Sequence, residues 1–243
     1  MNTKKEVHTM LNRFAFKLRI PDTEPGIRLI DAYPLRAELY SGDQLAQHAR
    51  ETAGLYRIDA RKGHDRLIPR LADNEKILLE THDMLNAVIE ENHRIAPAGE
   101  WLLDNFYLVE EQIRTAGRHL PEEYSKELPH LVNGPLEGFP QAYHIAIELI
   151  AHSDGRIDSD SLIAYIDAYQ RVTPLLLGEL WAIPIMFRLA LIENLRRIAD
   201  IISSNKRDRD AATHWVDRMI KVAKENPGSL ILVIADMAQS NPP

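Results

Sequence analysis

The fold is decided by the stretch LLLGELWAIPIMFRLALIENL, residues 175–195. Its length approaches that of a membrane-spanning helix, but it contains Glu179, Arg188 and Glu193. Each such charge costs about 2–3 kcal/mol at the centre of a bilayer. Since a helix that is apolar almost all round is normally central in a protein, we expect a buried helix over residues 177–203.

Helical patterns continue on both sides of this stretch. Apolar residues recur at intervals of three, four and seven, and short segments with Gly, Pro or charged residues separate the repeats. Further helices are predicted over residues 43–56, 65–92, 97–117, 139–152, 159–171 and 209–225, with a short one near residues 122–131. The apolar run over residues 230–238 has strand propensity, but the sequence offers it no partner strand, so we also predict a helix there. The expected fold is all-α: an array of packed antiparallel helices, either a bundle or solenoid-like, without a sheet.

The periodic part of the chain begins after residue 42. Residues 1–42 contain several Pro and Gly residues and little periodicity, which predicts an extended arm or linker. Residues 43–243 are expected to form the helical domain. A connection rich in Pro and Gly over residues 118–138 is the best candidate for an internal boundary.

The composition is typical of a folded protein in a reducing compartment. Apolar residues make up 45% of the 243 residues, enough for a core, and there is no Cys to form a disulfide or a thiolate. The first 20 residues lack the uninterrupted apolar core of a secretion signal, so a cytoplasmic location is expected. The net charge of −7 comes from interspersed charges of both signs, which argues against a nucleic-acid partner.

Residues 97–117 carry the densest group of candidate ligand-binding side chains. At about 100° per residue, apolar side chains form one stripe of this helix, while Glu100, Asp104 and Glu111 form another on the opposite side. Carboxylates that lie together can perform acid–base chemistry or bind sugar hydroxyls. Their position opposite the core stripe favours a solvated or partner-facing surface instead.

The sequence lacks the motifs that would identify an enzyme or a metal site. It contains no nucleophile elbow, phosphate-binding glycine loop or zincin motif. Glu90 and His93 have the Glu-x-x-His spacing of di-iron bundles, but such a site needs a second motif and two further glutamates on facing helices, and no such set is expected here. The sequence therefore predicts no catalytic residue, no metal ligand and no cofactor.

Seven short segments carry a resemblance to a known family. They are GEWLLDNF (99–106), EEQIR (110–114), HLP (119–121), ELP (127–129), AYQRVTPL (168–175), GELWAIPIM (178–186) and LIENLRR (191–197). In this order they resemble the N-terminal region of cyclic β-1,2-glucan synthases, and the resemblance runs from about residue 39 to the C-terminus. A co-linear agreement of this length is more specific than any single short motif.

The resemblance implies a very large inner-membrane enzyme that polymerises glucose from UDP-glucose, adjusts the chain length with a phosphorylase-like domain and releases cyclic glucan. This chain would be the segment before the membrane-embedded glucosyltransferase, and it looks like a fragment or a short open reading frame. Because it carries none of that enzyme's catalytic motifs, the resemblance implies a non-catalytic scaffold or docking module at the cytoplasmic face of the inner membrane. Its partner would be the remainder of the synthase or its transferase domain, and it would meet the membrane only through that enzyme.

A second interpretation is a free-standing module that binds a carbohydrate or a sugar nucleotide. In this case Trp101 and Trp181 would stack on the ligand, and Asp104, Glu111 and Arg188 would supply hydrogen bonds.

Arg188 is also expected to be largely buried and paired with a carboxylate from another helix. Its neighbours three and four residues away are not acidic, so a partner on the same helix is unavailable. Asp104 and Glu111 are the candidate partners, which would turn the acidic stripe toward residues 177–203. The alternative is that Arg188 reaches water along its aliphatic stem.

Overall fold

The computed structural model describes residues 35, 37–91, 93–153, 155 and 157–240. Within this part of the chain the helices are α3 (Gly42–Leu55), α4 (Leu67–Glu90), α5 (Pro97–Asp104), α6 (Phe106–His119), α7 (Glu122–Glu127), α8 (Gln141–Ser153), α9 (Ser159–Gln170), α10 (Leu177–Glu225) and α11 (Leu230–Ser240). A 3-10 turn, η1 (Pro227–Ser229), joins the last two helices. The prediction of an all-α fold is confirmed. Most of the predicted arm, residues 1–34 and 36, lies outside the described residues.

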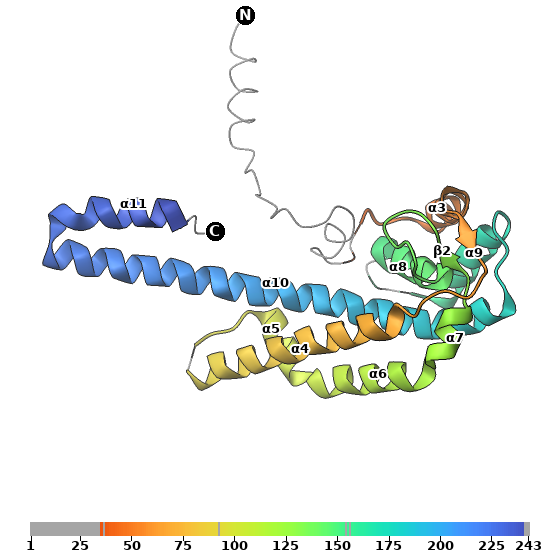
Figure 1. Cartoon of the computed structure of the whole chain (residues 1–243), viewed down its shortest axis with the longest axis horizontal. Coiled ribbons are helices and arrows are strands. Elements are labelled where there is room, and N and C mark those ends of the chain that lie inside the picture. The colour runs from red at the N-terminus through yellow and green to blue at the C-terminus, as the bar shows by residue number, and fades with distance from the viewer. Residues whose placement is uncertain (1–34, 36, 92, 154, 156, 241–243) are drawn as a thin grey trace, which may run out of the picture.

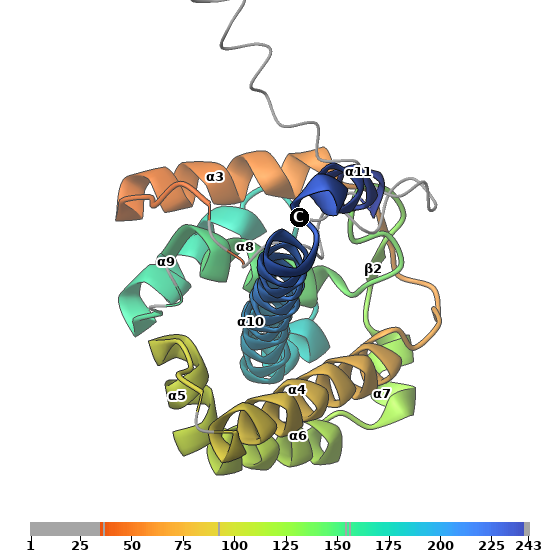
Figure 2. The same cartoon turned by 90° about the vertical axis from the view of Figure 1, so that its left-hand side faces the viewer.

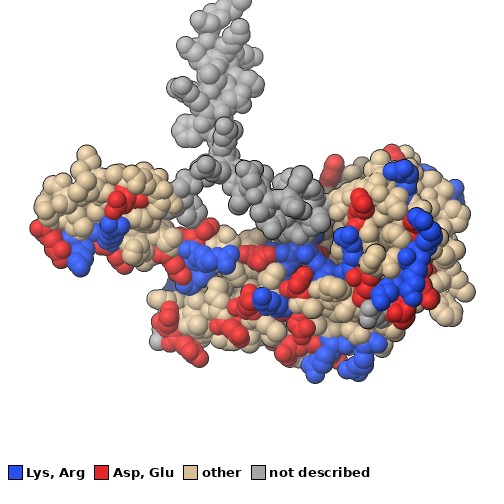
Figure 3. All heavy atoms as spheres, viewed as in Figure 1, with Lys and Arg blue, Asp and Glu red and all other residues tan. Residues whose placement is uncertain are grey.

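Helix α10 is 49 residues long and runs through the whole molecule (Figure 1). The prediction of separate helices over residues 177–203 and 209–225 is wrong, because the charged segment between them contains neither Gly nor Pro and continues the helix. Lys206 pairs there with Asp210 one turn later, a spacing that supports a helix. On the face shown in Figure 3, acidic and basic side chains are interspersed along the projecting part of α10. Within the described residues, neither this helix nor any other combines the length and apolar character needed to span a membrane.

The remaining helices pack around the first part of α10. Helices α8, α4 and α6 each contact α10 directly, and α6 also packs against α4. Seen along α10, helices α3, α8 and α9 lie on one side, and α4, α5 and α6 lie on the other (Figure 2). The C-terminal part of α10 projects beyond this body, and α11 folds back against it (Figure 1).

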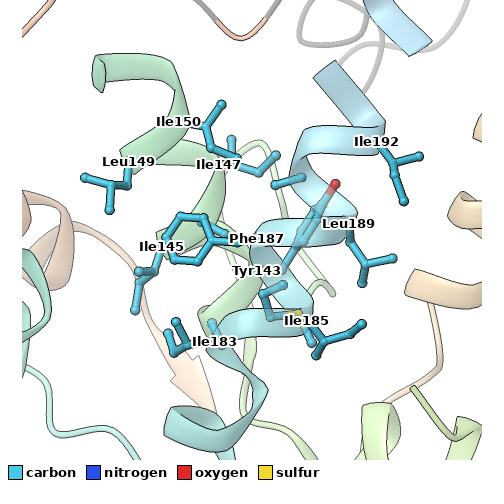
Figure 4. Packing of buried hydrophobic residues seen from close by; sticks show 14 of the residues in the cluster. Tyr143, Ile145, Ile147, Leu149, Ile150, Ile183, Ile185, Phe187, Leu189 and Ile192 are labelled. Atoms are coloured by element: carbon cyan, nitrogen blue, oxygen red, sulfur yellow. The ribbon is translucent and has the colours of Figure 1, made fainter. Parts of the chain in front are cut away.

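The core is centred on the contact between α8 and α10. Ten of the 13 residues of α8 are buried, which places this helix inside the molecule rather than on its surface. Ile145 and Leu149 of α8 and Met186 and Ala190 of α10 have no exposed surface. Figure 4 shows the aliphatic and aromatic side chains of the two helices meeting across this contact. The predicted burial of this helix is thus confirmed for the face that packs on α8, whereas Leu177 and Trp181 on α10 are exposed.

Two local features differ from the prediction. Strands β1 (Ile58–Asp59) and β2 (His130–Leu131) pair antiparallel, so the expectation of no sheet at all is wrong in this detail. Each strand has two residues, which is too short to leave a periodic signal. The helix predicted over residues 97–117 is divided at Asn105, whose side-chain amide donates a hydrogen bond to the carbonyl oxygen of Trp101 at 2.8 Å.

Candidate functional site

An apolar groove lies where α10 faces α5 and α6. Its volume is about 520 Å³. Trp101 of α5, Leu108 of α6 and Leu191 of α10 line it, and their exposed fractions are 54%, 41% and 43%. Large apolar side chains that gather at a groove and remain exposed indicate an interaction site.

One polar pair crosses this groove. Arg188 of α10 is partly buried, and its Nε donates a hydrogen bond to Oε1 of Gln112 on α6 at 2.8 Å. The partner of Arg188 does come from another helix, but the prediction that Arg188 is largely buried and paired with a carboxylate, Asp104 or Glu111, is wrong, because Arg188 is only partly buried and its partner is a neutral glutamine. Gln112 follows Glu111 directly, so it lies about 100° further around the helix, on the side that faces α10.

The structure separates the other candidate residues from this groove. Glu100, Asp104 and Glu111 are exposed, which is the solvated position that the apolar stripe on the opposite side of the helix favours. Trp181 is 76% exposed and does not line the groove. Of the six residues singled out in the sequence, the structure brings together Trp101 and Arg188.

The chemistry of the groove fits an apolar occupant better than a sugar. Among the described residues, only three polar side chains line the groove, and each already makes one hydrogen bond: Arg188 donates to Gln112, and Oδ1 of Asn194 accepts from the backbone N–H of Leu35 at 2.7 Å. A carbohydrate site presents several convergent polar groups to the ligand hydroxyls. Trp101 is the feature that would suit a sugar ring, because an exposed indole can stack on it.

Glu193 is the centre of a buried ionic network that the sequence analysis missed. Its carboxylate accepts hydrogen bonds from Arg70 of α4 at 2.7 Å, from Arg196 at 2.8 Å and from Arg197 at 2.9 Å. Burial alone would raise the pKa of Glu193, but the interactions with Arg70 and Arg196 outweigh it and lower the pKa. The i+3 and i+4 spacing of the arginines was a visible signal, whereas Arg70 comes from a distant part of the chain. These residues of the LIENLRR segment therefore tie α4 to α10.

Glu179 is a second buried carboxyl group. One oxygen accepts a hydrogen bond from the backbone N–H of Leu176 at 2.8 Å, at the start of α10, and the other has no hydrogen-bond partner among the described residues. Burial raises the pKa of Glu179 to about 7. A carboxyl group with this pKa can act as a general acid or base when it lies in a cleft. Glu179 is 1% exposed, so it is sealed from a substrate and its role is to begin α10.

Fold and groove together define an all-helical module with an apolar interaction surface. None of the protein-family models compared with the chain matches it. The chain is 36% identical over 154 residues to the cyclic β-(1,2)-glucan synthase NdvB of Rhizobium meliloti (strain 1021). The match covers 63% of this chain and 5% of that protein. This similarity supports the family relationship that the seven segments suggest, and it relates the chain to a small part of a much longer protein.

Proposed function

We propose that this chain is a non-catalytic docking module of a glucan synthase that resembles NdvB. The apolar groove carries the proposal, because covering the exposed side chains of Trp101, Leu108 and Leu191 with another surface would remove apolar area from water and so favour binding. The similarity to 5% of a synthase supports a partner within such an enzyme, and its transferase domain is the first candidate. The proposal includes a location at the cytoplasmic face of the inner membrane.

An amphipathic helix is the occupant that the groove suits best. Helices lay apolar residues spaced three, four and seven apart into apolar grooves of this kind. The walls are themselves helices, α6 and α10, so a third helix would extend the same mode of packing. The Arg188–Gln112 pair crosses the groove and can bond a polar residue at the edge of the incoming helix.

The hairpin of α10 and α11 offers a further apolar surface that supports a docking role. Val216 and Ile220 of α10 are 51% and 48% exposed, and Ile231 and Leu232 of α11 are 72% and 64% exposed. A hairpin that projects from the body of the protein with apolar side chains in solvent is suited to contact another domain.

Binding of the chain to the remainder of the synthase, expressed separately, tests the proposal. Leu191→Glu places a charge in the groove and should weaken binding by at least about tenfold. Leu79→Glu is the matched control, because Leu79 is 39% exposed on α4 and lies outside the groove lining. Failure of the wild-type chain to bind, or equal binding by both variants, would reject the groove as a docking site.

The second candidate function is a module that binds a sugar or a sugar nucleotide, and the exposed indole of Trp101 favours it. Calorimetric titration with UDP-glucose and with short β-1,2-glucans separates the two functions. The docking proposal expects no saturable heat with either ligand. Saturable binding that is lost in Trp101→Ala and retained in Trp181→Ala would favour the sugar-binding module.

A further inference from the structure

Three polar side chains interrupt the apolar surface of α8 at intervals of four residues. His144, Glu148 and His152 share one face of this helix because side chains four residues apart lie above one another. His48 of α3 meets this face, with its Nε2 2.7 Å from Oε2 of Glu148. Nε2 of His152 lies 3.8 Å from the same oxygen. One donor atom from each of His48, Glu148 and His152 lies within 4.8 Å of the other two.

We propose that His48, Glu148 and His152 form a binding site for a divalent transition-metal ion, and that Zn²⁺ is the ion their donor atoms favour. Two imidazole nitrogens and one carboxylate oxygen form a ligand set that zinc uses with water in the fourth position. Mg²⁺ and Ca²⁺ prefer shells made of oxygen alone. Tetrahedral zinc places neighbouring donors about 3.3 Å apart. The two separations from Oε2 of Glu148, 2.7 and 3.8 Å, lie on either side of this value, and all three donor atoms lie within 4.8 Å of one another.

His152 is held in the tautomer that a metal ligand requires. Its Nδ1 lies 2.7 Å from the backbone carbonyl oxygen of Glu38. Since a carbonyl oxygen can only accept, Nδ1 carries the proton and donates it. In the neutral ring the lone pair of Nε2 then faces the Glu148 carboxylate, and a cation between the two groups removes the repulsion. Tyr40 stacks on the same ring, with centroids 4.1 Å apart and planes 7° apart, which fixes its orientation.

Glu148 is supported from its other oxygen. Nε2 of His144 lies 3.5 Å from Oε1, whereas His48 and His152 face Oε2. His144 is 1% exposed, and its ring nitrogens have no hydrogen-bond partner among the described residues. His144 is thus a third histidine beside Glu148, on the side of the carboxylate away from the two proposed ligands.

The cluster is accessible to an incoming ion. The side chains of His48 and Glu148 are 18% and 24% exposed, so water can complete the coordination. A bound ion would connect α3 to α8. It would also steady the segment before α3, where the backbone N–H of Ala37 donates to the carbonyl oxygen of Ala151 at 2.9 Å. The four-residue spacing of Glu148 and His152 is visible in the sequence, but the third ligand, His48, lies on a different helix, so the spacing alone does not reveal the site.

Metal binding by the wild-type chain is the first test. After removal of any tag and treatment with a chelator, titration with Zn²⁺ should show one ion per chain with a Kd below about 10 µM. Saturation should raise the Tm, because the ion binds the folded state. Co²⁺ should give the intense visible absorption of four- or five-coordinate cobalt. Absence of saturable Zn²⁺ binding, or the weak absorption of octahedral Co²⁺, would overturn the proposal.

Variants locate the site on the chain. His48→Gln and His152→Gln should each lower the Zn²⁺ affinity by at least about tenfold. His93→Gln is the matched control, because Nδ1 of His93 lies 3.3 Å from an exposed glutamate, Glu91, outside the cluster. Far-ultraviolet circular dichroism of the metal-free variants shows whether they fold. If one variant unfolds, the Co²⁺ spectrum of the wild type and the Zn²⁺ affinity of the other variant still test the proposal. Equal affinities of the wild type and the two cluster variants would overturn the proposal.

Discussion

Oε1 of Gln112 accepts a hydrogen bond from Nε of Arg188 at 2.8 Å, and this pair joins α6 to α10 beside the apolar groove. The acceptor is neutral, and both side chains are partly buried. The contact is thus weaker than a buried ion pair. It still fixes the position of the Arg188 side chain, a constraint that a fully solvated arginine would lack. A neutral acceptor also leaves the charge of Arg188 available to a docked partner.

The first prediction concerns this pair. Arg188→Ala should lower the free energy of unfolding by about 1.5–2 kcal/mol, the lower part of the usual range for a hydrogen bond to a charged group, because both side chains are only partly buried. A buried ion pair that loses one member costs about 3–5 kcal/mol. Urea unfolding of Arg188→Ala, Gln112→Ala and the double variant should give a coupling of about 1 kcal/mol. A coupling near zero would show that the two side chains do not interact in solution.

The Glu193 network should contribute much more to stability. Glu193→Ala removes the acceptor that Arg70, Arg196 and Arg197 share, and it should lower the free energy of unfolding by about 3–5 kcal/mol. The control is Glu80→Ala, which removes an exposed ion pair with Lys76 at 3.9 Å and should cost less than about 0.5 kcal/mol. Urea denaturation compares the two. Similar losses for both variants would contradict a structural role for the network.

The sequence predicted the helices well because each depends on local periodicity. Residues 175–195 are apolar almost all round, and most of residues 182–192 lie in the core, whereas Trp181 and Leu191 are exposed. The continuity of α10 could also have been inferred, since residues 205–209 lack Gly and Pro and contain Lys206 four residues before Asp210. The motifs that suggested a glucan synthase agree with the similarity to NdvB.

The parts that the sequence could not predict depend on contacts between distant segments. Spacing along one helix cannot reveal that Arg70 reaches Glu193 across 123 positions, or that His48 meets Glu148 across 100. The partner of Arg188 was missed for a related reason. A charge-based argument considers acidic partners, whereas the rotation of α6 presents a neutral glutamine to α10.

Glu179 should make the stability of the chain depend on pH near neutrality. Its ordinary pKa is 4.5, and burial raises the pKa to about 7 in the folded state. Between these values the folded chain keeps a proton that the unfolded chain has lost. The contribution of Glu179 to the free energy of unfolding is therefore fully present below about pH 4.5. It decreases by at most about 3 kcal/mol as the pH rises to 7. Glu179→Gln removes this titration. The free energy of unfolding of the wild type minus that of the variant should fall from pH 5 to pH 7. Parallel plots of unfolding free energy against pH for the two proteins would contradict the raised pKa.

The last prediction compares two glycines with positive φ. Gly134 has φ of 89° and Gly155 has φ of 72°, a region that costs an L-residue roughly 1–2 kcal/mol. A Cβ at Gly134 would clash with Cε1 of Tyr56, whereas a Cβ at Gly155 would meet no atom of the described residues within 4 Å. The ring of Tyr56 cannot move away freely, because it packs edge-on against His144 with centroids 4.8 Å apart.

Gly155→Ala should thus lower the free energy of unfolding by about 1 kcal/mol through backbone strain alone. Gly134→Ala adds the displacement of a packed ring, and overpacking of this kind costs about 1–3 kcal/mol more. Thermal and urea unfolding of the two variants measure the difference. Because the backbone term is shared, the excess loss in Gly134→Ala reports how firmly Tyr56 is held. Equal losses would mean that the loop at Gly134 yields and that Tyr56 does not hold it against His144.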